Sequence, residues 1–97
     1  MTDPKPAKSL QTVSNIPVFN IIVHVRRDTE GNVNARVANL PDLVCSASSE
    51  RDVLAKIVKE FKQFAKSHSE NETPIPWIEP ISPKESDEQT RFIPVHL

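Results

Sequence analysis

Residues 39–64 constrain the fold of this chain most, because a strand-like run passes there through a serine-rich corner into an amphipathic helix. Ser49 can cap that helix, and Asp52 three positions later can complete a capping box. Glu50 and Asp52 also place negative charge at the positive end of the helix dipole. Large apolar residues then follow at helical spacing: Val53, Leu54, Ile57, Val58, Phe61, Phe64 and Ala65. The pattern predicts a helix over residues 50–67, about 27 Å long, with one buried face.

Two alternating segments precede this stretch. Residues 19–25 place Phe19, Ile21, Val23 and Val25 on one side and Asn20, Ile22 and His24 on the other. Period-two alternation with β-branched residues predicts a strand with one buried face, and residues 33–38 repeat the pattern. The loop between them, residues 26–31, ends in the only glycine, Gly31, which tolerates the positive φ that a hairpin needs. The two segments are therefore predicted to pair antiparallel.

Three further segments complete the predicted fold. Residues 43–47 form a short third strand after a turn in which Pro41 fixes φ. Residues 74–83 are too rich in proline for a helix and predict an extended strap. Residues 91–97 alternate again, and Pro94 restricts them to an edge strand because proline cannot donate to a ladder. The result is an α+β fold of order βββαβ: a three-stranded antiparallel sheet, one helix packed on one sheet face, and a C-terminal edge strand.

Length and composition limit the organisation of the chain. Its 97 residues allow one small domain, which we place at residues 16–97. Residues 1–15 are polar and lack periodicity, which predicts a disordered tail, with a partner-contacting arm as the alternative. The net charge of −1 gives no global basic field for nucleic acid. One cysteine, no apolar run behind Met1 and no apolar segment of about 18 residues favour a cytoplasmic location.

Short motifs resemble those of HicB-like antitoxin domains. Leu-Pro-Asp-Leu-Val at residues 40–44 and Ala-Ser-Ser-Glu-Arg-Asp-Val-Leu at 47–54 resemble that family's turn, strand and helix start. Ile-Pro-Trp-Ile-Glu-Pro at 75–80 resembles the segment before its last strand. The resemblance implies a partial RNase-H-like sheet that masks a partner protein, such as a small toxin, and that can form a homodimer. Asp42 and Ala47 replace two glycines of the family pattern, and no DNA-binding segment follows the domain.

Catalysis is not expected. An RNase-H-like nuclease needs carboxylates on its central and last strands to hold metal ions, and residues 19–25 and 91–97 contain none. Cys45 with His24 lacks an activating context for a thiol nucleophile, so Cys45 is interpreted as a small strand residue. The histidines, His24, His68 and His96, lack metal-ligand spacing. We therefore expect no catalytic residue, no metal site and no cofactor.

The face of the predicted sheet away from the helix is the first candidate for binding. It carries Ile22, His24 and Arg36, which fit either a solvated or partly covered surface or a contact face for another protein. Trp77, in the strap, either packs over the sheet or helix edge or forms an exposed anchor for a partner. The first hypothesis is a non-catalytic protein-binding module that uses Ile22, His24, Arg36 and Trp77.

The predicted helix offers an alternative function. A row of lysines at near-helical spacing lies on its outer side: Lys56, Lys59, Lys62 and Lys66. Such a row is either a solvated face or a set of phosphate contacts for RNA or DNA. Stacking aromatic residues are missing from that face, and single-strand binders generally need them. A nucleic-acid-binding module is therefore the second hypothesis.

Overall fold

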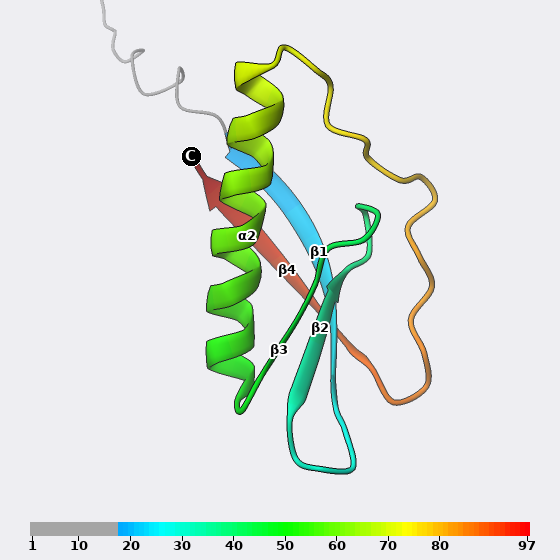
Figure 1. The fold of residues 1–97 in the computed structure, drawn as a ribbon. Coiled ribbons are helices and arrows are strands. Elements are labelled where there is room, and N and C mark those ends of the chain that lie inside the picture. The colour runs from blue at the N-terminus through cyan, green and yellow to red at the C-terminus, as the bar shows by residue number, and fades with distance from the viewer. Residues whose placement is uncertain (1–17) are drawn as a thin grey trace, which may run out of the picture.

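A computed structural model describes residues 18–97, so the predicted tail at residues 1–15 lies outside the described part of the chain (Figure 1). One sheet of order β3-β2-β1-β4 contains strands that all pair antiparallel. The predicted α+β class is confirmed, and the C-terminal strand joins the sheet at its edge beside β1. In chain order the elements are β1 (Val18–Arg27), β2 (Val33–Val37), β3 (Val44–Ala47), α2 (Glu50–Glu70) and β4 (Gln89–His96).

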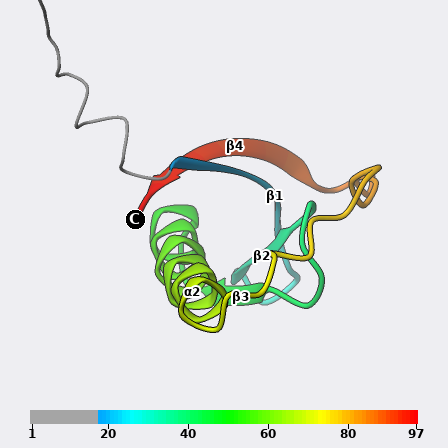
Figure 2. The same cartoon turned by 90° about the horizontal axis from the view of Figure 1, so that it is seen from above.

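One side of the sheet and one stripe of the helix share the hydrophobic core. Figure 2 shows the sheet curving from β3 to β4 with α2 along its concave side. Burial of each large side chain contributes on the order of 1.5–3 kcal/mol, which outweighs the small intrinsic propensity for helix. The buried core contains Ile21, Val23, Val25, Val33, Ala35, Val37, Leu40 and Val95 from the sheet and its corners, and Val53, Ile57, Phe61 and Ala65 from α2.

The helix begins where the sequence predicts and ends three residues later than predicted. Ser49 caps the first turn, and its Oγ accepts a hydrogen bond of 3.1 Å from the Asp52 backbone N–H. The helix then continues to Glu70 rather than stopping at Ser67. Residues 67–70, the last turn, are all polar. Hydrophobic periodicity, from which the length of the helix was predicted, therefore stops before the helix does.

A Schellman motif closes the helix. The Thr73 N–H donates to His68 O at 2.9 Å and the Glu72 N–H donates to Ser69 O at 3.1 Å. Glu72 has φ of 55°, the left-handed conformation that glycine usually supplies at this position. The chain thus builds a glycine-type helix end from a glutamate, which no local sequence signal marks.

Two turns of the sheet also contain a residue with positive φ, one a glycine and one not. Gly31 has φ of 87° in the predicted hairpin loop, where Asp28 accepts hydrogen bonds from the Glu30 and Asn32 backbone N–H groups. Asp42, in the turn before β3, adopts φ of 62° although it is not a glycine. The corner therefore keeps the backbone conformation of glycine at some cost in strain.

Candidate partner-binding surface

The strap, residues 74–83, is fixed to the chain that follows β2. The Ile78 N–H donates to Asn39 O at 3.0 Å, and the Ser82 N–H donates to Ala38 O at 2.9 Å. Ala38 in turn donates its N–H to Ile22 O at 2.6 Å. Residues 38 and 39 thus lie between β1 and the strap and connect the two by backbone hydrogen bonds.

The Asn39 side chain reinforces this junction. Its Oδ1 accepts the Ile22 N–H at 3.0 Å, and its Nδ2 donates to Asn20 O at 3.2 Å. The Asn39 side-chain amide therefore pairs with one backbone donor and one backbone acceptor of β1 at a place where β2 has already ended. The strap is consequently an ordered part of the outer face and not a loose connection.

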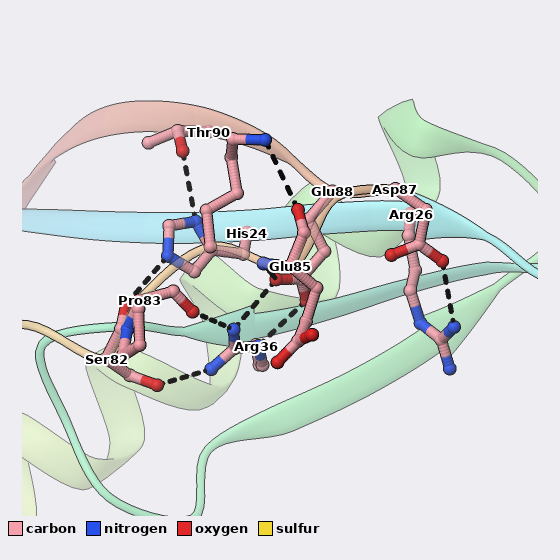
Figure 3. Close-up of polar contacts among 10 residues, drawn as sticks. His24, Arg26, Arg36, Ser82, Pro83, Glu85, Asp87, Glu88 and Thr90 are labelled. Atoms are coloured by element: carbon pink, nitrogen blue, oxygen red, sulfur yellow. Dashed lines mark hydrogen bonds and ion pairs between the residues drawn. The ribbon is translucent and has the colours of Figure 1, made fainter.

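His24 lies beneath the end of the strap. Its side chain is buried, with Nε2 3.0 Å from Ser82 O and Nδ1 3.1 Å from Thr90 Oγ1 (Figure 3). Because a carbonyl oxygen only accepts, Nε2 carries the proton in the neutral ring, and Nδ1 accepts from the Thr90 hydroxyl. The chain itself therefore covers His24, one of the residues predicted for partner contact, and of the alternatives considered for this face a covered surface describes it.

Arg36 is also engaged within the chain. Its Nε donates to Glu88 Oε2 at 2.8 Å and its Nη2 donates to Glu88 Oε1 at 2.7 Å (Figure 3). Nη1 donates to Ser82 Oγ at 2.7 Å and Nη2 to Pro83 O at 2.8 Å. With these bonds the guanidinium fastens both the strap and the residue before β4, so it is not a free cation on the outer face.

Glu88 is the acidic centre of this network. Its side chain is buried and also accepts the Glu85 backbone N–H at 2.8 Å. The hydrogen bond from Arg36, followed by the Glu85 bond and the positive charge of Arg36, outweighs the effect of burial and lowers the pKa of Glu88 to about 2. Glu88 therefore stays ionised near neutral pH, and an exposed ion pair of 3.2 Å between Arg26 and Asp87 lies beside it.

A separate groove with apolar and polar walls lies between β1 and the strap, and we call it the Trp77 groove. The Trp77 ring packs on Phe19 and Phe61, with centroid distances of 6.2 and 6.1 Å. Even so, Trp77 is 42% exposed, so both sequence alternatives for it, packing and exposure, apply at once. The groove measures about 360 Å³ and is lined by Val18, Phe19, Asn20, Ile22, Asn39, Trp77, Ile78, Glu79 and Ile81.

The predicted contact residues therefore separate into two groups. Ile22 and Trp77 line the Trp77 groove, whereas His24 and Arg36 belong to the network that holds the strap. Sequence reasoning missed Glu88 and Thr90, because only the pairing of β4 with β1 brings the start of β4 beside these residues. No pattern in the neighbouring sequence indicates that Glu88, beside a predicted strand, would be buried.

The lysine row remains on the outside of α2. All four lysines are exposed, and Lys56 Nζ donates to Ser46 O at 2.9 Å. Lys62 and Lys66 line an open hollow of about 560 Å³ together with Ser69, Glu70 and Leu97, and the negative charge of Glu70 there disfavours a phosphate group. The row has the character of a solvated face.

The groups considered for a nucleophile or a metal site can be located in the described residues. Burial raises the pKa of the Cys45 thiol, which makes it a poorer nucleophile. Within residues 18–97 no group of three or more histidine, cysteine or acidic side chains is placed to hold a metal ion.

Comparison of the chain with protein-family models, with curated proteins and with solved structures found no match. In the described part of the chain, no helix has the length and apolar character needed to cross a membrane. The geometry of the Trp77 groove and of the network beside it is therefore the basis for inferring a function.

Proposed function

We propose that this chain is a non-catalytic protein-binding module of the kind that HicB-like antitoxins contain, with a small toxin as the partner and the Trp77 groove as the contact surface. The observation that carries the proposal is the state of Trp77. Phe19 and Phe61 hold its ring from within, and 42% of the residue stays exposed. A rigid aromatic side chain loses little conformational entropy on binding, and such residues dominate interface energetics.

The surroundings of Trp77 support this use. Val18 and Ile81, which also line the groove, are 49% and 37% exposed. Three exposed apolar side chains that line one groove favour contact with another molecule, whereas single scattered ones need no such explanation. Glu79 is an exposed acid on the same groove, which favours a partner with basic residues at the rim.

His24 and Arg36 have a supporting role in this proposal. They hold Ser82 and Pro83, and Ser82 directly follows Ile81 of the groove. Fixing the strap before binding reduces the entropy lost when a partner docks. Their replacement should therefore weaken binding by loosening the strap rather than by removing a direct contact.

The proposal is tested with the small protein encoded by the neighbouring gene, coexpressed and then titrated in calorimetry. We expect a one-to-one complex, and Trp77→Ala should weaken it by about 2 kcal/mol or more, roughly thirtyfold. Val44→Ala is the control, because Val44 is 66% exposed on β3 and lies outside the groove. No binding by the neighbouring protein, or equal weakening by both variants, contradicts the proposal.

A salt titration separates this proposal from nucleic-acid binding. Binding through apolar contacts should change little with salt, whereas binding to phosphates weakens steeply as salt rises. We expect no measurable binding to mixed-sequence RNA or single-stranded DNA. Submicromolar, salt-sensitive binding that is lost in Lys59→Ala, Lys62→Ala and Lys66→Ala combined would favour the nucleic-acid alternative instead.

A further inference from the structure

The two edges of the sheet differ in how they are protected. At one edge β3 has only four residues, and Lys56 Nζ already occupies the Ser46 carbonyl at 2.9 Å. At the other edge β4 has eight residues, and no strand of the described chain lies on its outer side. Long uncovered edges present unpaired backbone donors and acceptors that favour pairing with another strand.

The hydrogen bonds of β1 reveal which groups of β4 face outward. The Ile22 N–H and C=O and the Asn20 C=O all bond to residues 38 and 39, so they point away from β4. In an antiparallel pair, two residues directly opposite each other either both point their N–H and C=O groups at the partner strand or both point them away from it. Phe92, opposite Ile22, and Pro94, opposite Asn20, therefore direct their backbone groups to the free edge.

The same alternation places the backbone groups of Thr90 and His96 at the free edge. Pro94, which lacks an N–H, falls at a position that needs no donor toward β1. The edge thus offers donors and acceptors at Thr90, Phe92 and His96 and an acceptor at Pro94.

We propose that this edge pairs antiparallel with β4 of a second copy of the chain, about a two-fold axis at Ile93. In this register Thr90 lies opposite His96 of the second copy and the two exchange both backbone hydrogen bonds. The Phe92 N–H donates to Pro94 O of the second copy, so the ladder lacks one bond for each copy, where Pro94 has no donor. An axis at Phe92 would instead set Thr90 opposite Pro94 and leave His96 without a partner in β4.

The side chains of β4 fit the same register. Phe92, 75% exposed on the outer face, would lie over Pro94 of the second copy and bury its ring. Ile93 is only partly buried within one chain and would meet Ile93 of the second copy at the axis. Arg91, the only charged residue of β4, already pairs with Glu50 at 2.7 Å, so self-pairing brings no unpaired like charges together. The charges of β4 thus permit self-pairing, and the match of its two halves in one register favours a second copy as the occupant.

Sedimentation equilibrium of the full chain tests the association. We expect a dimer at tens of micromolar for the wild type and a monomer for Phe92→Lys, because an edge lysine opposes strand pairing. Val44→Lys is the matched control, since Val44 is an exposed apolar residue on the other edge strand. A monomeric wild type, or a Phe92→Lys variant that dimerises as well as the wild type, overturns the proposal.

Cross-linking tests the register. With Cys45→Ala as background, Ile93→Cys places two thiols in a non-hydrogen-bonded pair with Cα atoms about 4.5 Å apart, within disulfide range. Mild oxidation should link most of the protein as a dimer. Gln89→Cys should not link, because two such residues would lie about 27 Å apart. Linkage at Gln89→Cys without linkage at Ile93→Cys overturns the register, provided that circular dichroism shows both variants folded.

This inference is independent of the proposed partner. Trp77→Ala should remain dimeric while losing the binding described above, and Phe92→Lys should retain that binding as a monomer. If the neighbouring protein dissociates the wild-type dimer and protects Phe92→Cys from alkylation, then β4 receives a foreign strand and the second copy is the wrong occupant.

Discussion

Arg36 and Glu88 lie 52 positions apart in the chain, and their side chains meet in a bidentate ion pair with N···O distances of 2.8 and 2.7 Å. Arg36 belongs to β2 and Glu88 directly precedes β4, so the pair reaches across β1, which lies between these strands. The Glu88 side chain is 5% exposed and the Arg36 side chain 28% exposed. Removing one member would leave a buried charge without compensation, which is costly.

The first prediction concerns acid. The pKa of Glu88 is about 2 in the folded chain, against an ordinary value of 4.5. As pH falls, the unfolded chain takes up this proton first, so the contribution to stability is complete above about pH 4.5 and is lost between pH 4.5 and 2. The loss should reach roughly 2–3 kcal/mol, measured by urea unfolding across that range.

Two variants identify the source of this acid dependence. Glu88→Gln should reduce stability at neutral pH and flatten the slope below about pH 4.5. Glu85→Gln, at an exposed position of the same loop, should leave the slope as it is. An acid slope in Glu88→Gln equal to that of the wild type would show that other carboxylates cause it.

The second prediction concerns the strap. His24→Ala removes the hydrogen bonds to Ser82 and Thr90 and leaves their partly buried polar groups unpaired, which should cost about 1–3 kcal/mol. Hydrogen exchange at the Ser82 amide, which bonds to Ala38 O, should accelerate more than exchange in α2. His96→Ala, at an exposed histidine, serves as the control and should change neither quantity. Equal acceleration throughout the chain would indicate global unfolding instead of strap opening.

The third prediction concerns the aromatic core. Phe61 is fully buried and packs edge-to-face on Phe19 at a centroid distance of 5.6 Å. Phe61→Ala should cost about 3–5 kcal/mol and shift Trp77 fluorescence to longer wavelength, because Trp77 loses one of its two aromatic supports. Lys62→Ala, one position along on the exposed side of α2, should change stability by less than about 0.5 kcal/mol in the same urea titration.

The fourth prediction concerns the end of the helix. Glu72 has φ of 55°, where glycine carries no Cβ penalty, so Glu72→Gly should raise stability by about 1 kcal/mol. Lys66→Gly, at an exposed position inside α2, should lower stability by about 1 kcal/mol. Thermal melts of the two variants should therefore shift in opposite directions. A shift of the same sign in both would mean that the left-handed conformation at Glu72 carries no strain.

Much of the fold follows from local patterns. Alternation from Phe19 to Val25 and helical spacing from Val53 to Ala65 predict the elements and their buried sides, because each pattern is fixed by the period of its own backbone. Ser49 as the cap followed from the same local rules. The end of α2 at Glu70 did not follow from local rules, because Glu72 adopts a left-handed conformation that glutamate rarely takes.

By itself the sequence determined the elements and which sides of them are apolar. Only the tertiary structure decided that His24 and Arg36 would be used inside the molecule and that Trp77 would stand half exposed against Phe19 and Phe61. Those outcomes depend on the strand order β3-β2-β1-β4, which brings residues dozens of positions apart into contact. No local period encodes such contacts, because they arise from how separate elements pair and from where the strap crosses them.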